Sequence, residues 1–214
     1  MSTVSKAQIC NLALSHINQT ETQISKLDTD TGNTAIQCRI HYDVAREFVL
    51  ADHHWNFAKK RVVLTDIGSP PTNWVYRYDY PSDCLKMREI ERLTRKDLPI
   101  PFGIEDDGSE NGLSIVTDKD EATGIYTYNV QNVSLFSPGF VAALGWYLAS
   151  ELAPALSGDL KKQESTLAVY NRIMAAAEGT DSDEGEMDPE LDSPWERART
   201  DGSSGGTDQF GRPL

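Results

Sequence analysis

Apolar residues recur at helical spacing near the start of the chain. Ser5 and Gln8 stand three residues apart, which is the spacing of a capping box. The residues that follow place one stripe along a helix: Ile9, Leu12, Ala13, His16 and Ile17. The pattern predicts a helix that begins after Ser5 and ends near Asn18.

A second helix is predicted after a polar linker over residues 19–31, with Asp30 or Thr31 as its cap and its end near Asp52. Two neighbouring apolar stripes run along it. One consists of Ala35, Cys38, Tyr42, Ala45 and Val49, and the other of Ile36, Ile40, Val44 and Phe48. A helix that is apolar on two sides needs cover on both. We therefore expect it to pack on two sides, either inside the domain or against another subunit.

The pattern changes between residues 74 and 133, where short apolar runs alternate with turns that contain glycine. Residues 74–81 alternate aromatic and polar side chains and end at Pro81, which is typical of an extended edge segment. Four more strands are predicted at residues 84–93, 100–104, 113–117 and 125–130. Together these runs predict one small antiparallel sheet inserted between helical segments.

Helical spacing returns after Ser137, which precedes a proline at the first helical position. A core stripe follows, made of Val141, Leu144, Leu148 and Leu152. Pro154 is expected to end or kink this helix. A last helix is expected to run to about Glu178.

The predicted fold class is α+β. Residues 1–73 and 134–178 supply a mainly helical bundle, residues 74–133 a small β-subdomain, and residues 179–214 an extended C-terminal tail. The tail is acidic, rich in Gly and Ser and poor in aliphatic residues, so it cannot bury enough apolar surface to offset its chain entropy. We expect it to be disordered unless a partner orders it.

Charge narrows the possible partners. The 214 residues include 33 acidic and 20 basic ones, a net charge of −13. Ten acidic and three basic residues fall within 180–214, so over half of the net charge belongs to the tail. A chain this acidic is not expected to grip nucleic acid through phosphates or to dock on anionic membranes. No apolar run of membrane-spanning length and no signal peptide are expected.

The three cysteines have no CxxC spacing, which argues against a zinc site or a disulfide framework and favours a reducing, cytoplasmic setting. No phosphate-binding or catalytic motif is present, so no enzyme activity, cofactor or metal is expected. Three weak candidates for chemistry remain: His41, His53 and His54 as metal ligands, residues 105–107 as a general acid and base, and Cys10 as a nucleophile. His53 and His54, with His41 twelve residues earlier, are interpreted as residues at a helix end, because adjacent histidines on a helix point about 100° apart and chelate poorly together. Residues 105–107 are interpreted as a solvated loop and Cys10 as an inert buried thiol.

Two clusters could contact a partner. Trp74, Tyr76, Tyr78 and Tyr80 form an aromatic ladder, for which packing or a subunit interface is favoured over base stacking because Arg77 alone interleaves with it. The short basic run at residues 59–61 is interpreted as a solvated face or an intersubunit salt bridge. We count Trp74, Tyr76 and Tyr78 as candidate partner-binding residues.

The tail contains a second candidate. Trp195 stands in an acidic segment beside Arg197 and Arg199. This composition is typical of an anchor that folds on a partner. The alternative is an inert, solubilising tail.

Several of these segments together resemble a known family, the head-to-tail adaptors of short-tailed bacteriophages (the tail tubular protein A family). Their order and spacing carry the resemblance across residues 4–178. The matching segments are residues 9–14, the positions Ala35, Cys38, Tyr42 and Arg46, residues 50–58 with Arg61, and residues 74–78, 80–84 and 148–154.

The resemblance implies a homo-oligomeric ring, expected to be a dodecamer, made of helical bundles that each carry a small β-subdomain. The ring would bind the phage portal protein on one side and the tail nozzle, of the tail tubular protein B type, on the other. Genomic DNA would pass through its channel without specific binding. The protein would be assembled in the bacterial host cytoplasm and reside in the neck of the virion.

Two alternatives belong to other classes. A small phage cell-wall hydrolase would need paired carboxylates, for which Glu89 with Glu91 or Glu105 with Asp107 are the candidates. An acidic DNA mimic that inhibits a host protein would act as a small free species rather than as a ring.

Overall fold

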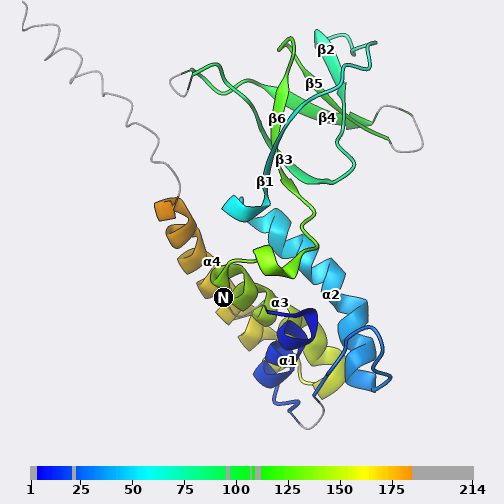
Figure 1. The fold of residues 1–214 in the computed structure, drawn as a ribbon, viewed down its shortest axis with the longest axis vertical. Coiled ribbons are helices and arrows are strands. Elements are labelled where there is room, and N and C mark those ends of the chain that lie inside the picture. The colour runs from blue at the N-terminus through cyan, green and yellow to red at the C-terminus, as the bar shows by residue number, and fades with distance from the viewer. Residues whose placement is uncertain (1–3, 21–22, 95–96, 107, 109–111, 185–214) are drawn as a thin grey trace, which may run out of the picture.

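The chain folds into a helical bundle that carries a β-subdomain at one end (Figure 1). The structure is a computed structural model that describes residues 4–184, apart from residues 21–22, 95–96, 107 and 109–111, and describes side chains as far as Ala177. Its α+β architecture confirms the predicted fold class.

The first helix, α1 (Lys6–His16), begins as its sequence predicts. The Ser5 side chain accepts from the Gln8 N–H at 3.2 Å, and the Gln8 side chain accepts from the Ser5 N–H at 2.7 Å. This reciprocal capping box satisfies two donors that a helix start otherwise leaves free. The polar linker that follows is held by Asn11, whose side-chain amide exchanges two hydrogen bonds of 2.9 Å with the backbone of Ile24.

The second helix, α2 (Asn33–Asp52), buries one of its two stripes and leaves the other exposed. Its cap is Gly32, without a side-chain hydrogen bond, so the prediction of Asp30 or Thr31 is wrong. Asp30 instead accepts from the N–H groups of Ser25 and Lys26 in the linker.

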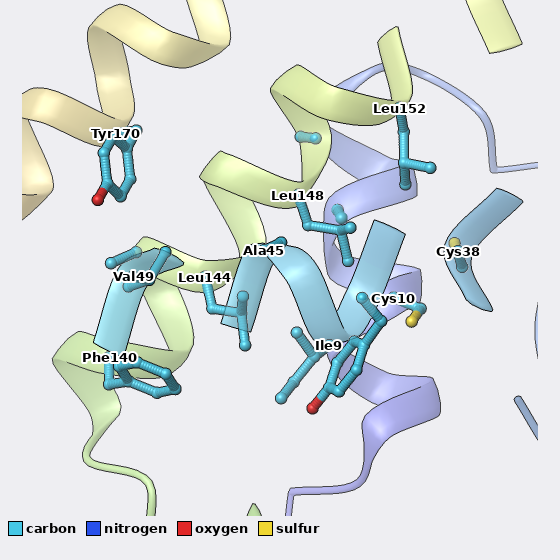
Figure 2. Packing of buried hydrophobic residues seen from close by; sticks show 14 of the residues in the cluster. Ile9, Cys10, Cys38, Ala45, Val49, Phe140, Leu144, Leu148, Leu152 and Tyr170 are labelled. Carbon is cyan, nitrogen blue, oxygen red and sulfur yellow. The ribbon is translucent and has the colours of Figure 1, made fainter. Parts of the chain in front are cut away.

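The bundle is centred on α3 (Pro138–Ser157), which contacts α1, α2 and α4 (Leu160–Glu184). Figure 2 shows α3 side chains directed at those of α1, α2 and α4. Phe140, Leu144, Leu148 and Leu152 are all fully buried. Burying each of these side chains contributes on the order of 1.5–3 kcal/mol of transfer free energy.

Three positions in α3 or at its end differ from expectation or depend on glycine. The helix continues through Pro154 to Ser157, so this proline does not end it. It ends at Gly158, whose φ of 63° is left-handed and favours glycine. Within the helix, a Cβ at Gly145 would lie 2.9 Å from Leu12 Cδ2, so the missing side chain lets α1 approach closely.

The β-subdomain contains two three-stranded antiparallel sheets rather than the single sheet predicted. In one, β6 (Thr123–Tyr128) lies between β1 (Lys59–Val63) and β3 (Cys84–Ile90). In the other, β5 (Leu113–Thr117) lies between β2 (Tyr76–Asp79) and β4 (Phe102–Asp106). Their shared core consists of Leu64, Tyr78, Met87, Ile90, Ile115, Ala122 and Tyr126.

The boundary between bundle and β-subdomain lies earlier than residue 74. Residues 59–63, placed with the helices by the sequence, form β1 and pair with β6 from Lys59↔Thr127 to Val63↔Thr123. Short 3-10 turns flank this insertion, η1 (Asn56–Ala58) before it and η2 (Val133–Leu135) after it. The chain therefore enters and leaves the β-subdomain along two adjacent strands.

Candidate functional site

The exposed apolar surface on α2 is the candidate interaction site. We define the outer face of α2 as Ile36, Ile40, Val44 and Phe48, which are 41%, 58%, 68% and 47% exposed. Successive members are four residues apart, so they follow one side of the helix over about 18 Å at 1.5 Å per residue. Exposed apolar side chains arranged in this way, rather than scattered, mark an interaction surface.

One edge of this face continues onto α3. The Phe48 ring stacks on Tyr147 with centroids 4.5 Å apart and planes 10° apart. Two turns earlier on α2, His41 Nδ1 lies 3.9 Å from Glu151 Oε2. The edge is therefore fixed by packing between two helices.

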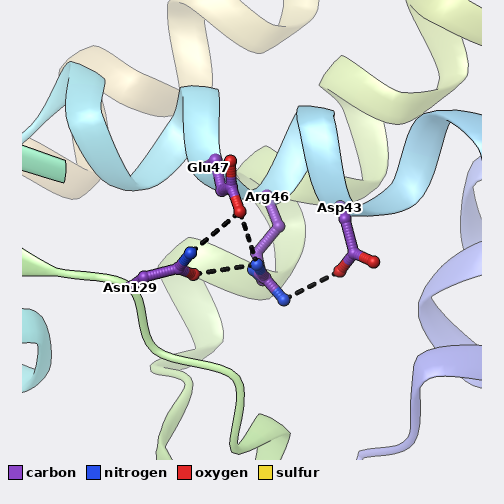
Figure 3. Close-up of polar contacts among 4 residues, drawn as sticks. All are labelled: Asp43, Arg46, Glu47 and Asn129. Carbon is purple, nitrogen blue, oxygen red and sulfur yellow. Dashed lines mark hydrogen bonds and ion pairs between the residues drawn. The ribbon is translucent and has the colours of Figure 1, made fainter. Parts of the chain in front are cut away.

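The other edge is acidic and is organised by Arg46 (Figure 3). The Arg46 side chain is only 3% exposed and donates to Asp43 at 2.8 Å and to Glu47 at 3.1 Å. It also donates to Asn129 Oδ1 at 2.8 Å, and the Asn129 amide donates to Glu47 at 2.8 Å. One guanidinium thus pairs two carboxylates, which leaves a net negative charge on the part of this edge beside Val44 and Phe48.

The same network ties the bundle to the β-subdomain, because Asn129 directly follows β6. A second tie comes from Arg88 in β3. Its Nη2 donates to the carbonyls of Ala51 and His53 at 3.0 and 2.8 Å, and its Nε donates to Thr127 Oγ1 at 2.9 Å. Burial lowers the pKa of this arginine. Arg88 therefore supplies donors to the carbonyls at the end of α2, where helical partners run out.

The basic run at residues 59–61 is engaged within the chain. Lys60 Nζ lies 2.6 Å from Asp83 Oδ2, and Arg61 Nε lies 3.2 Å from Glu91 Oε1. Burial alone would raise the pKa of Asp83, but hydrogen bonds from Lys60 and Tyr126 lower it. An intersubunit salt bridge through Lys60 or Arg61 would have to compete with these contacts.

The aromatic ladder packs inside the β-subdomain. Tyr78 is 2% exposed, and its hydroxyl donates to the Lys119 carbonyl at 2.8 Å, so its ring is not available to a partner. Tyr76 is half-buried with its ring 6.2 Å from that of Tyr78. Trp74 is half-buried beside Gly103 of β4. Partner binding stays a prediction for Trp74 and Tyr76.

Within the described part of the chain, the weak catalytic candidates do not form a free carboxylate pair. Glu89 lies 3.7 Å from Arg92, and Glu91 pairs with Arg61, so both carboxylates of that pair are engaged with arginines. Glu105 is exposed in β4, and its intended partner Asp107 lies outside the described residues. Among the residues that the structure describes, no group of three or more His, Cys, Asp or Glu could hold a metal ion.

Cys10 has the environment of an inert thiol. It is fully buried in the bundle core beside Cys38 (Figure 2). A hydrogen bond with Cys38, together with burial, raises its pKa, which suppresses the nucleophilic thiolate.

Arg88 and Asn129, which connect the β-subdomain to the bundle, are not among the residues predicted from the sequence. A single arginine in a strand looks like any solvated charge, and only the fold brings it to the end of α2. The tail candidates Trp195, Arg197 and Arg199 lie outside the described residues.

Comparison with known proteins gives no family: no family model matches the chain, and no curated protein matches it. Among the described residues, α3 is long and apolar enough to cross a membrane by length and composition. Half of its most apolar window is buried against the other helices, as in the core helix of a bundle.

Proposed function

We propose that this protein is a structural head-to-tail adaptor of a short-tailed bacteriophage. Copies of the chain form a ring, expected to be a dodecamer, between the portal protein and the tail nozzle. The ring extends the DNA channel, and the genome passes through without being specifically bound. Assembly takes place in the host cytoplasm, and the finished protein resides in the neck of the virion.

The observation that carries the proposal is the outer face of α2. A helix that buries one apolar stripe and exposes another is suited to a chain that completes its packing by assembly. A subunit of a ring must offer a face of this kind to its neighbour.

The residues that carry the sequence resemblance support the proposal from another side. Cys10, Cys38, Tyr42 and Arg46 are at most 2% exposed and form the contact between α1, α2 and the segment after β6, where Arg46 donates to Asn129. Trp55 is 1% exposed, and its Nε1 donates to the Val49 carbonyl at 2.9 Å. The resembling positions are thus the framework of the bundle, as expected if the likeness is one of fold.

Electron microscopy of the purified protein with and without its portal tests the proposal. We expect a ring that docks coaxially on the portal vertex. A protein that remains monomeric and never binds portal would refute the adaptor function. A protein that cleaves cell-wall glycan, and loses turnover when Glu91 is changed to Gln, would favour the hydrolase instead.

A further inference from the structure

We propose that the outer face of α2 in one subunit packs against the outer face of α4 in the next subunit. The outer face of α4 is defined by its exposed residues Lys161, Glu164, Ala168, Arg172 and Ala175. The proposal rests on the ring described above and assigns the two surfaces that build it.

The two faces lie on different sides of the molecule. Helix α3 contacts both α2 and α4, and Figure 1 shows α2 and α4 on opposite flanks of the bundle. A contact between two different surfaces leaves a free copy of each at every step, so it propagates and closes into a ring when the rotation allows. A contact of α2 with another α2 would stop at a dimer.

The shapes of the two faces complement each other. The outer face of α2 presents branched and aromatic side chains at a spacing of one turn. The outer face of α4 presents Ala168 and Ala175, two turns apart with Arg172 between them, and has Leu160 and Leu167 exposed along one border. Small residues let a neighbouring helix approach closely, so large side chains of one subunit fit over the small ones of the next.

Charge complements shape. The half of the α2 edge beside Val44 and Phe48 carries Asp43 and Glu47 around the single guanidinium of Arg46, a net negative charge. Arg39, one turn before Asp43, is positive and lies beside Ile36 and Ile40. On α4, the basic Lys161 and Arg172 flank one acid, Glu164, which gives a net positive charge. Opposite signs across the contact favour pairing of α2 with α4 and disfavour pairing of two α2 helices, whose acidic edges would repel.

Changing Val44 to Asp tests the face on α2. Val44→Asp places a carboxylate in the middle of the contact, so we expect mass photometry to show loss of the oligomer while circular dichroism stays that of the wild type. Val63→Asp is the matched control, because Val63 on β1 is 69% exposed and Val44 is 68% exposed. The control should assemble like the wild type.

A cysteine pair tests which surfaces meet. The variant Val44→Cys with Ala168→Cys, treated with a short bismaleimide, should give a ladder of covalent multimers, whereas Val63→Cys with Ala168→Cys should not. Cross-linking by Val44→Cys alone to a dimer without a ladder would overturn the assignment, since it shows α2 against α2. The native Cys10 and Cys38 are buried, whereas Cys84 is partly exposed and is therefore changed to Ser in every cross-linking variant.

The outcomes separate this interface from the adaptor function. A ring of unchanged size in Val44→Asp overturns the interface and leaves the function standing. A ring that depends on Val44 but docks on no portal overturns the function and leaves the interface standing. A wild-type chain that is monomeric both alone and on capsids that bear portals but lack tails overturns the interface.

Discussion

Trp55 fastens the end of α2 to the start of α3. Its ring is 1% exposed, meets Phe140 edge-on with centroids 5.2 Å apart, and donates through Nε1 to the Val49 carbonyl at 2.9 Å. We expect Trp55→Ala to lower the free energy of unfolding by about 3–5 kcal/mol, as for other large-to-small changes in cores. Urea denaturation measures the loss, and a change below about 1 kcal/mol would contradict this role.

His16 is expected to make the bundle less stable in acid. Its ring lies 3.6 Å from Trp146 in a stacked pair, and burial lowers its pKa from the ordinary value of 6.5. In the unfolded chain His16 binds a proton near pH 6.5, whereas in the folded chain it resists protonation. The neutral His16 ring therefore contributes its full stabilisation above that pH. The contribution is lost as the pH falls toward the lowered value in the folded state.

We therefore expect the thermal midpoint of the wild type to drop between pH 7.5 and 5.5, and to drop less in His16→Phe. The phenylalanine keeps the stack on Trp146 and cannot titrate. Equal slopes in the two proteins would show that other groups cause the acid sensitivity.

Only some of the side-chain contacts could be predicted from the sequence. The Ser5 and Gln8 box could be predicted because both partners lie within one turn. The roles of Arg46 and Arg88 could not, because Asn129 and the end of α2 reach them only through the tertiary fold. The sequence alone does not distinguish a buried arginine from a solvated one.

The joint between bundle and β-subdomain depends on one side chain from a strand. Arg88→Leu removes three hydrogen bonds and leaves the carbonyls of Ala51 and His53 without that donor. We expect a loss of about 1–3 kcal/mol in unfolding free energy and faster amide exchange near the end of α2. Arg61→Leu is the control, since its exposed ion pair with Glu91 is worth at most about 1 kcal/mol. Equal effects of the two changes would argue against the joint.

Helices were easier to predict than strands. The stripes of α2 and α3 recur over many turns, and both helices lie close to where the pattern placed them. The run at residues 59–63 reads as a basic, solvated segment, so its place beside β6 could not be inferred. Its pairing partner lies about 65 residues away, and no local pattern encodes such a contact.

At the scale of the whole molecule, the tail is predicted to anchor the ring to the portal. Deleting residues 185–214 leaves the described part of α4 in place and removes Trp195, Arg197 and Arg199. We expect rings of this variant to form but to bind portal more weakly in a sedimentation assay. Trp195→Ala should weaken binding in the same direction. Unchanged binding by both variants would show that the tail is not an anchor.

The pairing of β1 with β6 has a consequence for how such a protein can be altered. Because Lys59 lies opposite Thr127, the chain leaves the bundle and returns to it at neighbouring points. Besides the two backbone junctions, contacts of Arg46 with Asn129 and of Arg88 with the end of α2 connect the two parts. Leu85 of β3 and Tyr128 of β6 also pack against the bundle core. The segment can therefore be exchanged as one piece. Recombination that replaces it would change the surface at one end of the protein and leave unchanged the helices that are proposed to join the copies.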